Sequence, residues 1–488
     1  MCGFFAVISK TKINEHEFSS SLNTIKYRGP DSQKKKFYEI DNIYFGLGFN
    51  RLSIIDPFER SDQPYSSNDK KILMFNGEIY NYLDLSKESN WQRETNSDTE
   101  VLYNLLCEKK TEAFQKLNGM WAITFFDFIK KDILLSRDRF GQKPLYYFLD
   151  DKKFIISSSP QSINYYLKNS LEFSDDAVNE YLNLGFNFTN KSIFKNIKTV
   201  ANSSYEIFNF SKWKFEKKSK FFDYNNICYD QKLSNNLKLD LLSAVDRTLI
   251  SDRPIGLLLS GGIDSQIILQ LSKFLKKQTN LNFYCMYNDE SDFDFINTKI
   301  IDDHLKLNVN YIKDTGHITL KKFKQICKHQ HNLFPLIGNV ISTNQIYEHI
   351  SQTETKVVLD GCGADEIFAG YDYRYFSPFI KELFKNKKYF KIYNEVKFLN
   401  KNYLSFYFKD FIKYTFPFLK KLNKKNKYLK DTFYRNTDPI FGDNLDFNQL
   451  LKVDSFDGRL GMYLAHLDEN SMMYGLENRS PFLDKEII

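Results

Sequence analysis

The chain has 488 residues, of which 42% are hydrophobic and 26% are charged, and its formal net charge is +7. This composition excludes a wholly disordered chain, and the length predicts two or three domains. No apolar run approaches the roughly 20 residues that span a bilayer, and the apolar start has no basic region before it. We therefore expect neither a membrane span nor a signal peptide, and a cytoplasmic protein.

Short runs typical of β-strands dominate the first 150 residues, and turn residues separate them. One stretch, Thr99–Lys110, has the pattern of a helix. This mixture predicts a layered α+β domain over residues 1–210, rich in strand pairs. The runs are 4–9, 43–50, 71–82, 121–128, 132–138 and 153–159.

The sequence becomes polar from Ser211, and we assign residues 211–235 to a linker. Helical periodicity begins after Leu233. An apolar strand over 254–260, a glycine-rich turn and a helix over 263–277 follow, and further strands are expected at 281–287 and 356–361. Alternating strands and helices predict a second domain over 236–488 that is α/β with a mostly parallel sheet.

The six cysteines are scattered and form no CxxC pair. Neither a disulfide framework nor a zinc site is expected, and reduced thiols fit the cytosol. They are Cys2, Cys107, Cys228, Cys285, Cys327 and Cys362.

Cys2 is a candidate nucleophile because it follows the initiator methionine directly. Its small side chain makes removal of Met1 plausible, and the residue would then carry a thiol and a free α-amine. The amine titrates near pH ~8, close enough to neutrality to accept the thiol proton. Taken alone, Cys2 is better explained as an incidental small residue.

Two neighbouring patterns suit chemistry on an amide substrate. Asn76 and Gly77, in FNGEIYN, offer a side-chain amide and an unobstructed backbone N–H that can stabilise an oxyanion. Arg51 and Asp98 can hold the carboxylate and the ammonium of a free amino acid. Each pattern alone is also typical of an ordinary turn or a surface ion pair.

The patterns around Cys2, Arg51, Asn76 and Asp98 belong to a series of seven sequence motifs. In chain order these are MCGF, YRGPDS, RLSIID, FNGEIYN, SDTE, LNGMWAITFFD and RDRFGQKPLYY. Together they closely resemble the glutaminase domain of glutamine-dependent asparagine synthetases, which has the N-terminal-nucleophile fold. The resemblance implies that Cys2 attacks the glutamine amide and forms a thioester, with Asn76 and Gly77 as the oxyanion hole. It also implies a glutamine site made of Arg51, Leu52, Ser53, Ile54, Ile55, Asn76, Gly77, Glu78 and Asp98.

SGGIDS, from Ser260 to Ser265, stands between an expected strand and an expected helix. Its glycines let backbone N–H groups approach an anion, and the helix start adds a favourable dipole. The pattern lacks the lysine of the P-loop, which points away from kinase chemistry. The loop resembles the pyrophosphate-binding loop of enzymes that cleave ATP between the α- and β-phosphates.

The turn LDGCGADEIFAGY and the tail ENSMMYGLENRSPFLD extend the resemblance to asparagine synthetases over nearly the whole chain. It implies ATP as a substrate and Mg²⁺ held by Asp264 and Asp365, because this ion prefers carboxylate oxygen. The implied ATP site is Leu259, Ser260, Gly261, Gly262, Asp264, Ser265, Cys285, Asp360 and Gly361. The implied acyl-adenylate site is Cys362, Asp365 and Glu366.

Three positions depart from the family pattern and bear on the acceptor. Cys362 stands where an acidic residue is usual, Glu469 stands where a cation is usual, and His466 falls where a lysine is expected. The resemblance implies synthesis of asparagine from aspartate, with AMP and pyrophosphate as products and an internal tunnel for ammonia. The departures leave open another carboxylate, such as a uronic-acid sugar of surface polysaccharides, or a plain glutaminase with a degenerate second domain.

Residues 371–435 hold 17 Lys and Arg against 5 Asp and Glu, interleaved with Phe and Tyr. An anionic partner would suit this segment, but amphipathic helices with solvent-exposed lysines and buried aromatic residues explain it better, and no nucleic-acid partner is expected. Family members often form dimers, which leaves a homodimer open. They also usually continue beyond the equivalent of Ile488, so we expect a truncated or a shortened second domain.

Overall fold

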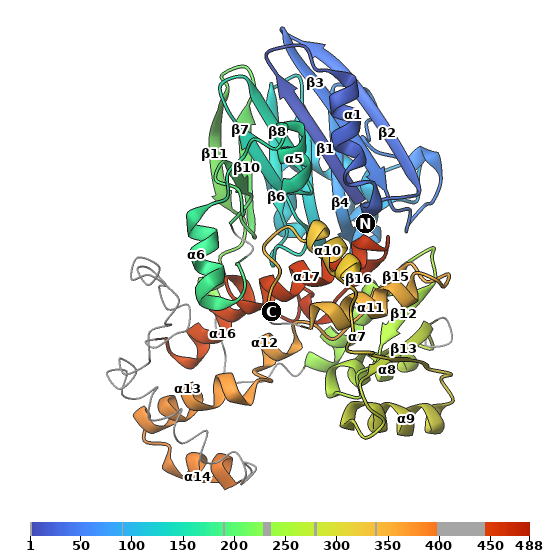
Figure 1. The fold of residues 1–488 in the computed structure, drawn as a ribbon, viewed down its shortest axis with the longest axis vertical. Coiled ribbons are helices and arrows are strands. Elements are labelled where there is room, and N and C mark those ends of the chain that lie inside the picture. Colours follow the sequence, from blue (N-terminus) through green and yellow to red (C-terminus); the bar gives the residue numbers. More distant parts are fainter. Residues whose placement is uncertain are drawn as a thin grey trace.

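The computed structural model describes residues 2–89, 91–188, 191–227, 236–277, 281–336, 339–397 and 445–488. Within these ranges the chain forms two antiparallel sheets, followed by one parallel sheet lower in Figure 1. Cys228 and the part of the basic segment from 398 to 435 lie outside the described residues.

The first sheet places the strand that carries Cys2 near its centre, in the order β2-β3-β1-β8-β7-β9. Phe4 of this strand packs between the two antiparallel sheets, whereas Phe5 packs against the helices on the outside. A strand buried on both faces must be apolar at every position, which explains the continuous run FFAVI. The strands are β1 (Cys2–Ser9), β2 (Ser32–Ile40), β3 (Ile43–Arg51), β7 (Tyr146–Leu149), β8 (Lys153–Ser157) and β9 (Ile197–Thr199).

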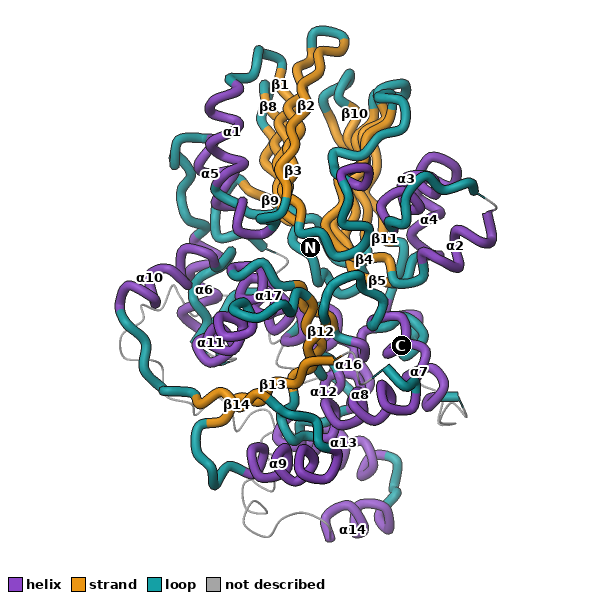
Figure 2. The backbone as a smooth tube through the Cα atoms, turned by 90° about the vertical axis from the view of Figure 1, so that its right-hand side faces the viewer, coloured by secondary structure: helices purple, strands orange, loops and turns teal. Residues whose placement is uncertain are grey.

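The second sheet has the order β11-β10-β6-β5-β4 and stacks on the first. Helices α1 (Glu15–Asn23) and α5 (Pro160–Tyr166) cover the outer face of the first sheet, and α2 (Tyr82–Ser89) and α3 (Asp98–Lys109) cover the second (Figure 2). The predicted layered α+β fold is confirmed. The strands are β4 (Lys71–Ile79), β5 (Gly119–Asp127), β6 (Asp132–Arg137), β10 (Ser204–Asn209) and β11 (Lys214–Lys220).

Strand β11 lies inside the segment that the sequence assigned to a linker. It pairs antiparallel with β10 from Ser204 to Asn209 and forms the edge of the second sheet. Its side chains are largely exposed, and because they bury little surface the strand can carry lysines where a buried strand would carry apolar residues. Lysine-rich edges discourage pairing with other chains, which explains why this strand reads as a polar connector.

The carboxy-terminal part is built on a five-stranded sheet, β14-β13-β12-β15-β16, in which every pairing is parallel. Helices α7 (Leu237–Thr248) and α8 (Ile263–Phe274) pack on one face, and α11 (Val340–Ile350) and α17 (Arg459–Met473) pack on the other. The predicted parallel sheet is confirmed. The strands are β12 (Ile255–Leu258), β13 (Leu281–Tyr287), β14 (Asn310–Lys313), β15 (Val357–Leu359) and β16 (Glu477–Arg479).

The remaining helices lie around this sheet and beyond it. Helix α13 buries Tyr375, Ile380 and Leu383, which agrees with amphipathic packing in the described part of the basic segment. The helices are α6 (Asp175–Leu184), α9 (Phe293–Leu305), α10 (Leu320–His329), α12 (Ala364–Phe368), α13 (Asp372–Lys385), α14 (Tyr389–Lys397) and α16 (Phe447–Phe456).

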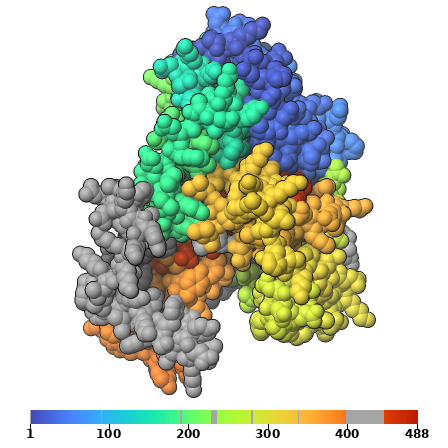
Figure 3. Space-filling view, viewed as in Figure 1, coloured from blue at the N-terminus to red at the C-terminus, as the bar shows by residue number. Residues whose placement is uncertain are grey.

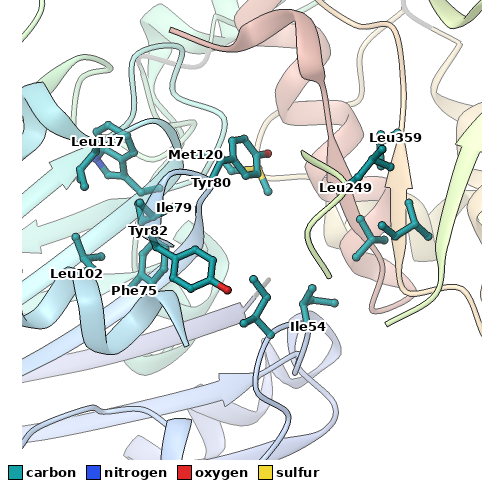
Figure 4. Packing of buried hydrophobic residues seen from close by; sticks show 14 of the residues in the cluster. Ile54, Phe75, Ile79, Tyr80, Tyr82, Leu102, Leu117, Met120, Leu249 and Leu359 are labelled. Carbon is teal, nitrogen blue, oxygen red and sulfur yellow. The ribbon is translucent and has the colours of Figure 1, made fainter. Parts of the chain in front are cut away.

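One apolar core runs from the amino-terminal part into the carboxy-terminal part. Figure 4 shows Ile54, Tyr80 and Met120 on one side and Leu249 and Leu359 across from them, and all five belong to the same cluster of buried residues. The segment after α10 also lies against the amino-terminal part (Figure 3), where the Leu336 N–H donates to the carbonyl oxygen of Gly185 at 2.7 Å.

In the described ranges, every helix is too short or too polar to cross a membrane. The described cysteines are free thiols, namely Cys2, Cys107, Cys285, Cys327 and Cys362.

Candidate functional site

Cys2 begins the central strand β1 and lies directly beside Asn76 of β4. The Cys2 backbone N–H donates to Asn76 Oδ1 at 2.8 Å, and the Cys2 thiol faces the carbonyl oxygen of Leu52 at 4.0 Å. Burial raises the pKa of the Cys2 thiol. A thiol in this setting needs a neighbouring base to become a nucleophile, and removal of Met1 would place an α-amine on the same residue.

The second amide atom of Asn76 is free for an oxyanion. Its Nδ2 is buried and has no hydrogen-bond partner, whereas Oδ1 accepts the Cys2 N–H. A buried unpaired donor beside a nucleophile suits a charge that develops only during reaction. The structure thus brings together Cys2 and Asn76, which the sequence predicted as partners.

Gly77 has no room for a side chain. Its φ is +153°, and a Cβ atom there would lie 2.0 Å from the carbonyl oxygen of Met120 in the paired strand β5. Only glycine therefore allows β4 and β5 to approach at this point. The backbone N–H predicted for the oxyanion hole consequently belongs to a residue fixed by close packing.

Glu78 and Asp98 form a buried acidic pair next to Cys2. Glu78 Oε1 has no partner, and Asp98 Oδ2 accepts the Ile79 N–H at 3.0 Å. Burial, with the Asp98 charge, raises the pKa of Glu78 well above its usual range, and burial raises the pKa of Asp98 to about 6. A substrate ammonium would stabilise both carboxylates in their charged form.

Arg51 is nearby but is already engaged by its own loop. Its Nη1 contacts Asp62 at 3.0 Å and its Nη2 donates to the carbonyl oxygens of Ile55 and Asp56 at 3.0 and 2.8 Å. These contacts fix the shape of the segment from Leu52 to Ile55. The arginine thus shapes the wall of the site, and its direct contact with glutamine stays a prediction.

The loop from Leu52 to Ile55 is held from both parts of the chain. The Ser53 N–H donates to Asp31 at 2.8 Å, while Arg253 Nε donates to the Ser53 carbonyl oxygen at 2.9 Å. The Asp252 N–H donates to the carbonyl oxygen of Ile54 at 3.1 Å. The carboxy-terminal part therefore helps to shape this wall.

Two residues near Cys2 were not assigned to this site from the sequence. Glu477 and Arg479, from β16 of the parallel sheet, are fully buried, and their side chains pair at 2.6 Å. Arg479 Nη2 also lies 3.4 Å from Glu78 Oε2. The signal was present in ENRSPFLD, since two opposite charges two positions apart share one side of a strand, but nothing local indicates a partner 401 residues away.

The second site lies at the carboxyl ends of β12 and β15. The loop after β12 is held by Ser265, whose hydroxyl accepts the Ser260 N–H at 3.3 Å and donates to the Gly262 carbonyl oxygen at 3.1 Å. Gly261 has φ +71°, and a Cβ there would lie 2.3 Å from the Asp294 carbonyl oxygen. Ligands of open parallel sheets bind at this edge, where loops and helix starts present N–H groups.

Asp264 and Asp365 face each other across this edge. Burial, with the Asp365 charge, raises the pKa of Asp264 to about 6, and burial raises the pKa of Asp365. Mutual repulsion of two carboxylates is relieved by a divalent cation, and Mg²⁺ needs few protein ligands when phosphate oxygens complete its shell. The pair fits Mg²⁺ in this way, although no group of three or more candidate ligands occurs among the described residues.

The other predicted nucleotide contacts gather at the same edge. The Leu259 N–H donates to the carbonyl oxygen of Tyr284 at 2.8 Å, and Gly361 packs so closely that its Cβ would lie 2.7 Å from Asp264 Cβ. Cys285 is buried within β13. The Asp360 carboxylate accepts from the Ser480 hydroxyl at 2.7 Å and from Asn478 Nδ2 at 2.8 Å, which ties this loop to β16.

A cavity of about 230 Å³ opens beside Asp360 and Gly361. Burial raises the pKa of the Cys362 thiol well above its usual range and that of Glu366 to about 7, so the thiol is protonated and Glu366 is about half protonated at neutral pH. His466 is 8% exposed, and neither ring nitrogen has a partner. The wall also includes Thr343, Asp365, Tyr371, Tyr463 and Leu467.

Glu469, which replaces an expected cation, does not bring a full negative charge. Burial raises its pKa to about 8, and it accepts the backbone N–H of His331 at 3.0 Å. Burial also lowers the pKa of His331 to about 3, so this ring is neutral. Both side chains are therefore mainly neutral at pH 7, and neither is among the residues that line the cavity.

Comparison with known proteins agrees with this two-site arrangement. A family model described as a glutamine amidotransferase domain matches residues 1–221, and one described as asparagine synthase matches residues 236–488. A putative glutamine-hydrolysing asparagine synthetase of Methanocaldococcus jannaschii is 32% identical over 76% of this chain and 76% of its own length.

Two further relatives are more distant. Glutamine-hydrolysing asparagine synthetase 1 of Bacillus subtilis is 29% identical over 76% of this chain and 59% of its own length. A protein named amidase chry2, of Gibberella zeae, is 26% identical over 73% of this chain and 55% of its own length.

Proposed function

This chain belongs to the glutamine-hydrolysing asparagine synthetase family of ATP-dependent amidotransferases, and we propose that it transfers the amide nitrogen of glutamine to aspartate. The observation that carries the proposal is the pairing of two sites in one continuous core. Cys2 lies beside the unpartnered Asn76 Nδ2 in one site, and the SGGIDS loop faces Asp365 in the other.

In the first half-reaction Cys2 is the nucleophile. Its α-amine, freed by loss of Met1, takes the thiol proton, and Sγ attacks the amide carbon of glutamine. Asn76 Nδ2 and the Gly77 N–H stabilise the oxyanion. Ammonia leaves with a proton returned from the α-ammonium, and water then hydrolyses the thioester to glutamate. Glu78 and Asp98 hold the glutamine ammonium.

In the second half-reaction an acceptor carboxylate oxygen attacks the α-phosphorus of ATP and displaces pyrophosphate. The loop Ser260–Ser265 holds the pyrophosphate through N–H groups and the start of α8. Mg²⁺ on Asp264 and Asp365 would neutralise phosphate charge. Ammonia then attacks the acyl carbon of the adenylate, and AMP leaves. The cavity beside Cys362 and His466 is the place for the acceptor.

A second acceptor class also suits the wall of that cavity. Thr343, Tyr371 and Tyr463 present hydroxyl groups, and His466 presents two unpartnered ring nitrogens. Such a wall can hydrogen-bond the hydroxyl groups of a uronic-acid sugar as well as the polar groups of an amino acid. The second candidate is therefore amidation of a sugar carboxylate by the same chemistry.

One incubation tests the proposal. The full chain is mixed with glutamine, ATP, Mg²⁺ and aspartate, and mass spectrometry follows glutamate, AMP and asparagine. Their joint appearance is expected. A parallel incubation replaces aspartate with a uronic acid, and AMP with an amide formed only there would select the second candidate. Glutamate without AMP for either acceptor would identify a plain glutaminase.

A further inference from the structure

Strand β16 contacts both sites with its two sides. The side chains of Glu477 and Arg479 point toward the glutaminase part, where Arg479 approaches Glu78. The side chains of Asn478 and Ser480 hold the Asp360 carboxylate at 2.8 and 2.7 Å. This is the alternation expected of a strand, whose successive side chains point to opposite faces.

Hydrogen bonds to groups other than Glu78 fix the guanidinium of Arg479 in place. Its Nη1 donates to the carbonyl oxygens of Thr248 and Ile250 at 2.8 and 2.7 Å, and its Nε donates to Glu477. The residue is fully buried. A planar donor group with this many fixed bonds has one orientation, so it can define the position of a neighbouring carboxylate.

Glu78 needs such a neighbour. It is 4% exposed, and the acids Asp98 and Glu477 and the phenol of Tyr80 face it together with Arg479. The carboxylates of Asp98 and Glu477 oppose the ionisation of Glu78, whereas the positive charge of Arg479 favours it. Oε2 points to Arg479 at 3.4 Å, and Oε1 is left without a partner.

We propose that Arg479 is a positioning residue of the glutamine site: it orients Glu78 so that Oε1 receives the substrate ammonium, and β16 links that orientation to the Asp360 loop. The inference rests on the proposed glutaminase reaction but not on the identity of the acceptor. Arg479 itself touches no substrate and acts through Glu78. A change that frees Asp360 should therefore weaken glutamine binding from the opposite side of the strand.

Glutamate release from glutamine, measured without acceptor, tests the role of Arg479. We expect Arg479→Gln to raise the KM for glutamine about tenfold or more and to change kcat by less, because a charge-assisted contact to the binding carboxylate is lost. Arg479→Lys should restore part of the affinity. The double variant with Glu78→Gln should show less than the sum of the two single effects.

Arg247→Gln is the matched control, because Arg247 contacts Asp484 and Glu486 in the same part of the chain. Urea midpoints identify variants that have merely lost stability. A KM in Arg479→Gln within twofold of the original, an equal rise in Arg247→Gln, or full additivity with Glu78→Gln would overturn the proposal. A chain that releases no glutamate at all would instead contradict the proposed function.

A separate double variant tests whether β16 couples the Asp360 loop to the glutamine site. We expect Asn478→Ala with Ser480→Ala to raise the KM for glutamine about fivefold, the lower range of coupling between distinct sites. These side chains contact Asp360 and not Glu78. An unchanged KM would overturn the coupling to the Asp360 loop.

Discussion

Arg28 Nη2 lies 2.8 Å from Asp468 Oδ2, and the two side chains are 0% and 3% exposed. The pair joins the amino-terminal part to helix α17, and Arg28 Nε also donates to the carbonyl oxygen of Cys2 at 3.2 Å. Lys143 Nζ adds a second cation 3.2 Å from Asp468 Oδ1. The backbone of Cys2, the predicted nucleophile, is thus tied to the carboxy-terminal part by a buried ionic cluster.

Removing Asp468 should be strongly destabilising. Asp468→Asn leaves the Arg28 and Lys143 cations buried with no carboxylate, which typically costs about 3–5 kcal/mol of unfolding free energy. Urea unfolding followed by tryptophan fluorescence measures it. Lys131→Ala removes an exposed ion pair with Asp41 and should change stability by less than about 1 kcal/mol. Equal losses in the two variants would contradict the assignment.

Asn76→Asp tests the oxyanion role. The aspartate keeps the oxygen that accepts the Cys2 N–H but loses the free Nδ2 donor. We expect glutamine-dependent kcat to fall by about 10²–10³, as for other oxyanion donors, while turnover driven by added ammonia persists. Asn81→Asp, two residues beyond the end of the same strand, is the control. Loss of ammonia-driven turnover would indicate a structural defect instead.

The placement of Cys2 beside Asn76 could be predicted because it depends on local residue types, whereas the catalytic role of Cys2 stays a prediction. A cysteine after Met1 and a glycine between Asn76 and Glu78 are visible in the sequence, and the apolar run after Cys2 predicts a buried strand. The β-type runs and the parallel sheet followed from their hydrophobic period for the same reason.

The contacts made by β16 could not be predicted in this way. A three-residue segment with Glu477 and Arg479 reads as a polar loop, yet it is fully buried because its charges pair with each other and with Glu78. Burial of charge depends on partners that are distant in sequence. Strand β11 was missed for the converse reason, since an exposed edge carries no apolar pattern.

The affinity of the Asp264–Asp365 pair for a divalent metal ion should depend on pH. The pKa of Asp264 is raised to about 6, so this carboxyl is protonated at pH 5 and ionised above pH 7. Mn²⁺, used as a probe for Mg²⁺ and followed by electron paramagnetic resonance, should bind about tenfold more weakly at pH 5 than at pH 7. Asp365→Asn should weaken binding at pH 7. Equal affinity at the two pH values would argue against these ligands.

Glu469 should make stability fall as pH rises. The folded pKa is raised to about 8 by burial, above the usual value of 4.5, so the unfolded chain loses this proton first. The contribution is fully present below pH 4.5 and is lost as pH rises toward 8. Glu469→Gln keeps the shape and has no proton to lose, so its advantage in unfolding free energy over the original chain, obtained from urea curves, should be small at pH 5 and should grow by about 3 kcal/mol by pH 8. Parallel midpoints at the two pH values would mean that the carboxyl ionises normally, and the neutral pairing with His331 would then be wrong.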